Sequence, residues 1–391
     1  MKAVKMRKVL VISSVIPISS IKHKRDENDI LLTTEDELLK RYRDLEFRYV
    51  FVHPRSNRIF ALLSQKWNSY FQTQKTKALI IKGKLVHPIG IYAVKRKKLN
   101  TFLFKISTVL IRKKIERLIK TFQPTIIHAH NVEMDLELAY WIHNRYGIPY
   151  IVTTREIANK TNSSRTNKLL KSASKIISLN RIQKDIASRM SGFKNVEVIT
   201  HGIDDKFFNY ATKTRNNTIR FLSVCRLLKL KNLDLVIKSL HKVGGDFEYN
   251  IYGTGPEEDK LKELVRSLEL EDKIKFWGYI DNDLLPSVYW NHDLFLMPSY
   301  PEAFGRVYLE AMASGTPVVA SKNTGVDGII LNGVNGFLVD HLNETEIQLL
   351  LNKIIKKQLS LSHFDKEARD TAERFNWNNI CLKLNEIYHI G

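Results

Sequence analysis

The stretch that decides the fold is PSYPEAFGRVYLEAMASGTPVVA, residues 298–320. Just before it, residues 294–297 form an apolar run typical of a short buried strand, and residues 318–320 form a second such run. Between them, residues 304–312 have the apolar spacing of an amphipathic helix, and the Ser-Gly-Thr-Pro sequence at 314–317 ends it. We therefore predict a strand, a helix and a second strand that form one βαβ unit of a parallel sheet.

Two glutamates mark the functional edge of this unit. Glu302 and Gly305 follow the first strand, at the carboxyl edge where open α/β sheets bind ligands. Glu310 lies two helical turns further on, so the two carboxylates are expected on the order of 12 Å apart. Glycoside hydrolase pairs lie roughly 5–9.5 Å apart, so the spacing disfavours hydrolysis and suits an extended ligand, a nucleotide sugar, held at two points. The alternative is a helix whose acids complement its dipole and pair with solvent or a lysine.

Cations and glycines follow two other predicted strands. Arg226 and Lys231 come after the apolar run 219–224, and two cations at a strand end can neutralise a diphosphate leaving group. A solvated surface role is the alternative for both. Gly253 and Gly255 follow the run 249–252 and allow a tight turn, but they lack the dinucleotide and P-loop spacings, so a plain turn is an equal alternative to ligand contact.

Length and composition favour a globular protein of two domains. A chain of 391 residues is too long for one ordinary core, and no stretch approaches the twenty apolar residues of a membrane span. The run 9–16 resembles a signal peptide, but it is short and leads into a charged segment, which favours a first buried strand. Cys225 and Cys381 form neither a disulfide framework nor a metal motif, so a reducing cytoplasm is the expected compartment.

The positive charge is concentrated in the first half of the chain. Residues 1–205 contain 39 Lys and Arg against 17 Asp and Glu, whereas residues 206–391 contain 23 against 24. Basic clusters at 95–98 and 112–114 flank or lie within a predicted amphipathic segment, one helix or two, at 99–122. We predict peripheral docking on an anionic membrane surface. Nucleic acid binding, for which no motif is present, and an inert solvated surface are the alternatives.

The motifs together carry a family resemblance. The sequence PEAFG at 301–305, with EAMA at 310–313 and GTPVV at 315–319, resembles the glutamate-seven-residues-glutamate signature of family 4 retaining glycosyltransferases, which have the GT-B fold. Residues 224–232 resemble the family's diphosphate clamp, 251–256 its glycine turn, 276–280 its base-side strand and 332–339 its late hairpin. The first loop, residues 13–20, departs from the family pattern because it contains no glycine.

The resemblance implies an α/β fold of two doubly wound, Rossmann-like domains that face each other across a cleft. Residues 1–205 would form a basic, membrane-facing acceptor domain, and residues 206–375 a domain that binds the nucleotide sugar. Residues 376–391 would form a C-terminal helix that returns to the first domain.

The resemblance also implies roles for individual residues. The donor would be a nucleoside diphosphate sugar, with UDP or GDP, and no cofactor would be needed. Glu310 would hold ribose hydroxyls, Arg226 and Lys231 would neutralise the diphosphate, and Glu302 would hold the sugar or phosphate end. Further donor contacts are expected from Phe304, Gly305, Arg306, Gly253, Gly255 and Tyr279. His130, the second histidine of a His-x-His sequence, would lie beside the donor sugar, with His128 as the second candidate.

The implied activity is that of a metal-independent, retaining hexosyltransferase. The basic first domain, rather than the resemblance, predicts a lipid-linked or cell-envelope glycan as the acceptor, and with the cysteine usage it places the protein in the cytoplasm, on the inner face of the cell membrane. Asp281 and Asp283 have metal-like spacing, but their place before a helix favours a capping pair. The alternatives are a nucleotide-sugar epimerase of the same fold and a noncatalytic polyanion-binding protein.

Overall fold

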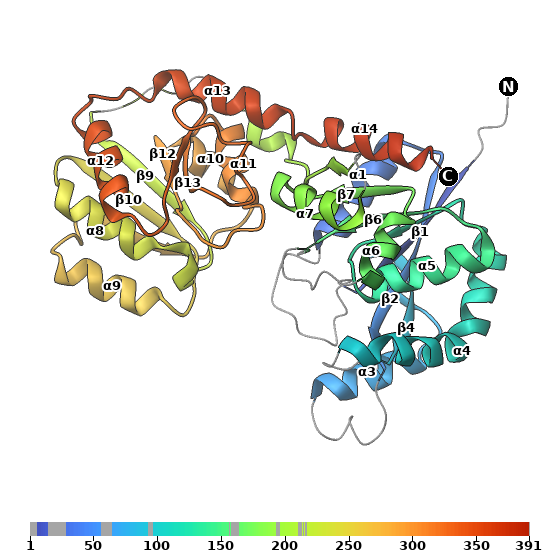
Figure 1. Cartoon of the computed structure of the whole chain (residues 1–391). Coiled ribbons are helices and arrows are strands. Elements are labelled where there is room, and N and C mark those ends of the chain that lie inside the picture. The colour runs from blue at the N-terminus through green and yellow to red at the C-terminus, as the bar shows by residue number, and fades with distance from the viewer. Residues whose placement is uncertain are drawn as a thin grey trace, which may run out of the picture. The chain divides into compact units, whose positions relative to one another are not determined.

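The computed structural model describes residues 6–14, 29–55, 65–92, 97–155, 157, 164–192, 196–209, 213, 215 and 217–390. It divides into two compact units (Figure 1). Unit 1 comprises Met1–Leu179, Gln183–Thr200 and Cys381–Gly391, and unit 2 comprises Asn180–Ile182 and His201–Ile380. Each unit is built on its own, largely parallel sheet, which confirms the predicted α/β class with two doubly wound domains.

Unit 1 contains an eight-stranded sheet in the order β3-β4-β2-β1-β5-β6-β7-β8. Neighbouring strands are parallel except β3, which pairs antiparallel with β4. The strands are β1 (Arg7–Ser13), β2 (Leu45–Pro54), β3 (Leu79–Ile81), β4 (Lys84–Ile91), β5 (Ile126–Ala129), β6 (Tyr150–Thr154), β7 (Lys175–Ser178) and β8 (Val196–Val198). The helices between them are α1 (Asp29–Arg41), α3 (Gln65–Lys75), α4 (Lys97–Phe122), α5 (Met134–Tyr146), α6 (Ser164–Lys171) and α7 (Arg181–Ser191).

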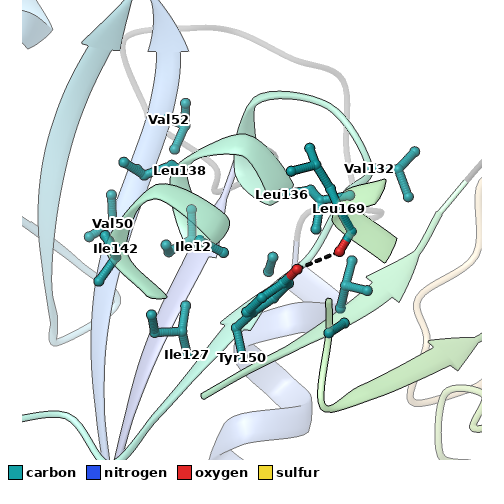
Figure 2. Packing of buried hydrophobic residues seen from close by; sticks show 14 of the residues in the cluster. Ile12, Val50, Val52, Ile127, Val132, Leu136, Leu138, Ile142, Tyr150 and Leu169 are labelled. Atoms are coloured by element: carbon teal, nitrogen blue, oxygen red, sulfur yellow. Dashed lines mark hydrogen bonds between the residues drawn. The ribbon is translucent and has the colours of Figure 1, made fainter. Parts of the chain in front are cut away.

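One face of this sheet carries the main core of unit 1. Ile12 and Val50 come from adjacent strands, and Leu136 and Ile142 come from α5, which lies over them (Figure 2). Strand residues alternate between faces, whereas helix residues meet the sheet at every third or fourth position. The Tyr150 hydroxyl, buried at the edge of this cluster, donates a hydrogen bond to the carbonyl of Leu169 (Figure 2). The opposite face of β5 is therefore left to other side chains, including both histidines of the His-x-His sequence.

Unit 2 contains a six-stranded parallel sheet in the order β11-β10-β9-β12-β13-β14. The strands are β9 (Ile219–Val224), β10 (Phe247–Tyr252), β11 (Ile274–Gly278), β12 (Leu294–Leu296), β13 (Val318–Ser321) and β14 (Phe337–Val339). The helices are α8 (Leu233–Val243), α9 (Glu258–Ser267), α10 (Leu285–Trp290), α11 (Arg306–Ala313), α12 (Glu344–Ile355) and α13 (Ser362–Glu373), with two 3₁₀ turns, η2 (Asp205–Phe208) and η3 (Lys229–Lys231). The last helix, α14 (Trp377–Tyr388), begins in unit 2, and its residues from Cys381 onward belong to unit 1. The strand order reverses between β9 and β12, and open α/β sheets bind ligands outside the carboxyl ends of the strands at such a point.

Three predicted elements differ in detail from the structure. The segment 99–122 belongs to the single helix α4. The predicted hairpin at 332–339 is wrong: residues 331–336 form a turn that Gly333 and Gly336 close, and β14 then pairs in parallel with β13. The first strand is confirmed but ends at Ser13, and most of the glycine-free loop that follows, residues 15–20, lies outside the described residues. Across the described part of the chain, no helix is long and apolar enough to cross a membrane.

Candidate active site

The loops after β9 and β12 lie side by side because these strands are neighbours. Leu222 of β9 pairs with Phe295 of β12. Beyond the strands, the Tyr300 amide donates to the Leu230 carbonyl at 2.8 Å, and the Asn232 side chain donates to the Pro298 carbonyl at 2.8 Å. These bonds fasten residues 228–232 to residues 298–302 at the switch point of the sheet.

This fastening brings together two of the predicted site residues. The Lys231 Nζ atom lies 2.7 Å from Glu302 Oε2, and only 15% and 14% of the two side chains are exposed. The Ser299 hydroxyl donates to the same Glu302 oxygen at 2.9 Å. Since the pair is shielded from water, its interaction is stronger than that of a surface ion pair. The sequence analysis missed Ser299, although it lies only three positions before Glu302.

Gly305 shapes the turn that leads into α11. Its φ is +65°, and a Cβ atom there would lie 2.4 Å from Cε2 of Tyr308 and 3.2 Å from Cγ of Glu302. The Tyr308 hydroxyl is in turn fixed by the Met297 carbonyl and by Ser299. The helix therefore begins at Arg306, four residues after Glu302 and two after the buried Phe304, and its first amides and positive dipole end lie at this edge.

Glu310 is the more deeply buried of the two glutamates. Arg306, one turn earlier on α11, donates from Nε to Glu310 Oε1 at 2.7 Å, and the Tyr289 hydroxyl donates to Oε2 at 3.3 Å. Only 3% of the Glu310 side chain is exposed, compared with 30% for Arg306. In this conformation little of the Glu310 side chain is open to a ribose, although a contact with ribose hydroxyls was predicted for it. Arg306 is the accessible residue of the pair.

The two glycines of the 251–256 turn allow two loops to pack closely. A Cβ atom at Gly253, whose φ is +125°, would lie 1.8 Å from the Cys225 carbonyl oxygen, and one at Gly255 would lie 2.2 Å from that of Leu227. The Leu227 amide donates to the Thr254 carbonyl at 3.0 Å. The glycines thus have a structural role, in keeping with the plain-turn alternative, and a role in donor binding stays a prediction.

Two further predicted donor residues lie at the surface of unit 2. Arg226, two positions after the end of β9, is exposed, and 59% of Tyr279, just after β11, is exposed. Strands β9, β10 and β11 are adjacent and parallel, so both residues lie at the carboxyl edge of the sheet. Asp283, one of the two carboxylates with metal-like spacing, pairs instead with Lys206 at 2.8 Å. In the part of the chain that the structure describes, no group of three or more His, Cys, Asp or Glu could hold a metal ion.

The predicted histidine lies in unit 1. His130 follows β5, is 7% exposed, and its ring centroid lies 3.9 Å from that of His128. Nearby, Asp135 at the start of α5 accepts hydrogen bonds at 3.0 and 3.2 Å from the amide and hydroxyl of Ser14, so it anchors the start of the loop after β1. Burial raises the pKa of Asp135 to about 7.

The fold and the edge of unit 2 define an α/β protein with a charged site at the switch point of a Rossmann-type sheet. Residues 204–371 match the family described as Glycosyl transferases group 1, and residues 36–207 match Glycosyltransferase Family 4. These matches divide the chain at nearly the same position as the two units. Together the two matches span residues 36–371, and the chain belongs to the family 4 glycosyltransferases, which have the GT-B fold.

Individual relatives resemble parts of the chain. It is 28% identical over 239 residues to mannosylfructose-phosphate synthase of Agrobacterium fabrum, covering 55% of this chain and 53% of that protein. It is 30% identical over 205 residues to the amylovoran biosynthesis glycosyltransferase AmsK of Erwinia amylovora, covering 50% of each. The chain thus spans about half the length of the curated relatives it matches. Among solved structures, the lipopolysaccharide outer core galactosyltransferase WaaB has a TM-score of 0.73 at 17% identity and covers 97% of this chain and 98% of its own, which supports the fold.

Proposed function

We propose that the protein transfers a sugar, with retention of configuration, from a nucleoside diphosphate sugar to a hydroxyl of a lipid-linked or cell-envelope glycan. The observation that carries the proposal is the cluster of Arg226, Lys231 and Arg306 with the start of α11 at one sheet edge, where Glu302 and Glu310 hold two of the cations. Such a cluster suits a diphosphate. A solved structure of similar fold, Anabaena HepE, was determined in complex with UDP, and its TM-score is 0.69 at 19% identity, with 99% of this chain and 100% of that chain covered.

In the proposed reaction, the bond between the sugar C1 and the diphosphate oxygen breaks, and its electron pair leaves with the nucleoside diphosphate. Arg226, Lys231 and the amides of α11 stabilise the charge that develops there. The acceptor oxygen bonds to C1 on the face that the diphosphate leaves, and its proton passes to the departing phosphate oxygen. Glu302 fixes Lys231 and accepts a hydrogen bond from a sugar hydroxyl. His130 lies beside the donor sugar in the family, and the same role is proposed here.

Helix α4 supports docking of unit 1 on an anionic membrane. Phe102, Ile106, Val109 and Leu110 recur at helical spacing, and 63%, 40%, 73% and 51% of them are exposed. They form an apolar stripe opposite the buried one that includes Phe104, Ile111 and Ile115. The exposed residues Lys105, Arg112 and Lys113 flank the exposed stripe.

Not every cation of the predicted basic clusters belongs to this surface. Lys114 turns inward, and its Nζ donates to the Pro88 carbonyl at 2.8 Å and the Thr76 carbonyl at 3.2 Å. In the cluster 95–98, residues 95 and 96 lie outside the described residues. The proposed membrane surface therefore rests mainly on Lys105 and Lys113, each of which contributes about 1 kcal/mol near an acidic bilayer. Arg112 contributes less, because its Nε atom lies 2.9 Å from Glu116 Oε1.

The donor site is tested by thermal-shift and calorimetric titration of the purified chain with UDP, GDP, ADP and their sugars. Arg226→Ala should weaken binding. The matched control is Lys229→Ala, which removes another exposed cation of the same loop that has no predicted role in the donor site and should leave binding unchanged. Failure of every nucleotide to bind the folded chain would favour the polyanion-binding alternative. Conversion of a UDP-sugar without any acceptor would favour the epimerase.

Membrane docking is tested by co-sedimentation with vesicles of phosphatidylglycerol and phosphatidylcholine. The double change Phe102→Ser and Val109→Ser should reduce the bound fraction on anionic vesicles. The matched control is Leu342→Ser in unit 2, where an isolated apolar side chain is 78% exposed. The proposed surface would be rejected if the wild-type chain bound pure phosphatidylcholine vesicles as well as anionic ones. It would also be rejected if Leu342→Ser reduced the bound fraction as much as the double change does.

A further inference from the structure

A buried histidine next to the candidate active-site histidine is held at both ring nitrogens. His128 is 2% exposed, and its Nδ1 atom lies 2.7 Å from the Tyr388 hydroxyl, while its Nε2 atom lies 2.8 Å from the Thr153 hydroxyl. Thr153 belongs to the neighbouring strand β6, and Tyr388 is the last residue of α14. Two elements that are distant in sequence therefore fix the rotation of one imidazole.

The ring of His128 in turn supports the ring of His130. Residues two positions apart on a strand point to the same face, so the two side chains lie next to each other at the end of β5. Their centroids are 3.9 Å apart and their planes are inclined by 35°, which is van der Waals contact. A rotation of His128 would thus displace His130.

The support is also electrically neutral. Burial, with a smaller contribution from the charge of Arg155, lowers the pKa of His128 to about 3. Burial raises the pKa of Tyr388 well above its usual value, so the phenol keeps its proton. Neither residue places a charge beside His130 near neutral pH.

We propose that Tyr388 and Thr153 are positioning residues that hold His128 as a fixed, neutral support for His130 during sugar transfer. This inference rests on the proposed function, in which His130 lies beside the donor sugar. It gives the last turn of the C-terminal helix a role in the geometry of the reaction. Tyr388 touches neither substrate nor donor in this scheme and acts only through the two imidazoles.

The first test is the variant Tyr388→Phe, which removes one hydroxyl and keeps the ring that packs edge-on against Phe47. We expect kcat to fall about 10- to 100-fold, as for other small misplacements of catalytic groups, with the KM for the donor unchanged. The matched control is Tyr150→Phe, because Tyr150 is a buried tyrosine of the same unit that loses a hydrogen bond to the Leu169 carbonyl instead. Equal kcat values for the two variants would overturn the proposal.

A second test uses the other ring nitrogen. Thr153→Val should lower kcat as Tyr388→Phe does, and Thr153→Ser, which keeps the hydroxyl, should restore it. Histidine ¹⁵N spectra of the full chain give a readout that is independent of turnover. Tyr388→Phe should shift the signals of both His128 and His130, whereas Tyr150→Phe should not. Unchanged His130 signals would contradict the proposed support.

The variant His130→Gln separates this inference from the proposed function. If His130→Gln is as active as the wild-type chain, the proposed role of His130 is wrong, and the positioning role fails with it. If His130→Gln is inactive while Tyr388→Phe matches its control, only the positioning role is rejected. If His130→Gln and Tyr388→Phe both lose activity while unit 2 still binds nucleotide, the proposed role of His130 and the positioning role of Tyr388 are both supported.

Discussion

Replacement of Gly305 by alanine should damage the proposed donor site more than the small size of the added methyl group suggests. The residue has a φ of +65°, and the added Cβ atom would lie 2.4 and 2.5 Å from two carbon atoms of the Tyr308 ring. That ring is fully buried, and its hydroxyl is fixed by the Met297 carbonyl and Ser299. The ring cannot move without releasing these bonds, so the strain falls on the turn that carries Glu302.

The size of the effect follows from two contributions. A non-glycine residue in the left-handed region costs roughly 1–2 kcal/mol. Forcing an extra carbon against a well-packed ring costs about 1–3 kcal/mol more. Gly305→Ala should therefore destabilise unit 2 by about 2–5 kcal/mol, and each kcal/mol lowers the melting temperature of a unit of this size by roughly 2–4 °C.

Gly333→Ala is the matched control. Gly333 has a φ of +76°, but a Cβ atom there would have no heavy atom within 4 Å. Thermal unfolding should show a loss of about 1–2 kcal/mol for Gly333→Ala, from the backbone alone. Calorimetric titration should show weaker nucleotide binding for Gly305→Ala only. Equal stabilities of the two variants, with equal nucleotide affinities, would refute the argument from Tyr308.

Three other predictions follow from the charges. In a double-mutant cycle, Glu302→Gln and Lys231→Met should show a coupling of about 1–3 kcal/mol in thermal unfolding; additive effects would mean that the shielded pair contributes nothing. Arg226→Ala should leave the melting temperature unchanged because the side chain is exposed, and it should weaken UDP or GDP binding about 10- to 100-fold in titration. The pKa of Asp135 is raised from 3.8 to about 7, so its contribution to stability is fully present below pH 3.8 and is lost as the pH rises through 7. The asparagine of Asp135→Asn can still accept the hydrogen bonds from Ser14 but does not titrate. The unfolding free energy of this variant minus that of the wild type should therefore rise between pH 5 and 8, and a constant difference would contradict the raised pKa.

The sequence predicts β9, β12 and β13 well because each is a mainly apolar, buried run. The run at 219–224 matches β9, and those at 294–297 and 318–320 match β12 and β13 to within one residue. The predicted helix at 304–312 begins two residues later in the structure, since Gly305 takes a left-handed conformation. The close approach of Tyr308, which leaves no room for a Cβ atom at Gly305, is not revealed by the hydrophobic pattern.

The contacts of the site are less predictable than its residues. The pair of Arg306 and Glu310 could be foreseen, because residues four apart on a helix are neighbours. The pair of Lys231 and Glu302 could not, since 71 positions separate them and only the adjacency of β9 and β12 brings them together. The contact of Tyr388 with His128 spans 260 positions and has no local signal at all.

The exposures of the two ion pairs indicate how the charges at the edge of unit 2 are divided. In the pair on α11, the arginine is 30% exposed and the glutamate 3% exposed, and in the other pair both side chains are equally shielded. Arg226 adds an exposed cation. The charge that a ligand would meet at this edge is therefore mainly positive, while Glu310 lies behind Arg306 and limits its rotation. Acids that hold cations in place create fixed positive charge at this edge. A doubly charged diphosphate gains from that charge and a neutral sugar does not, so the diphosphate should be the part of the ligand that binds most strongly.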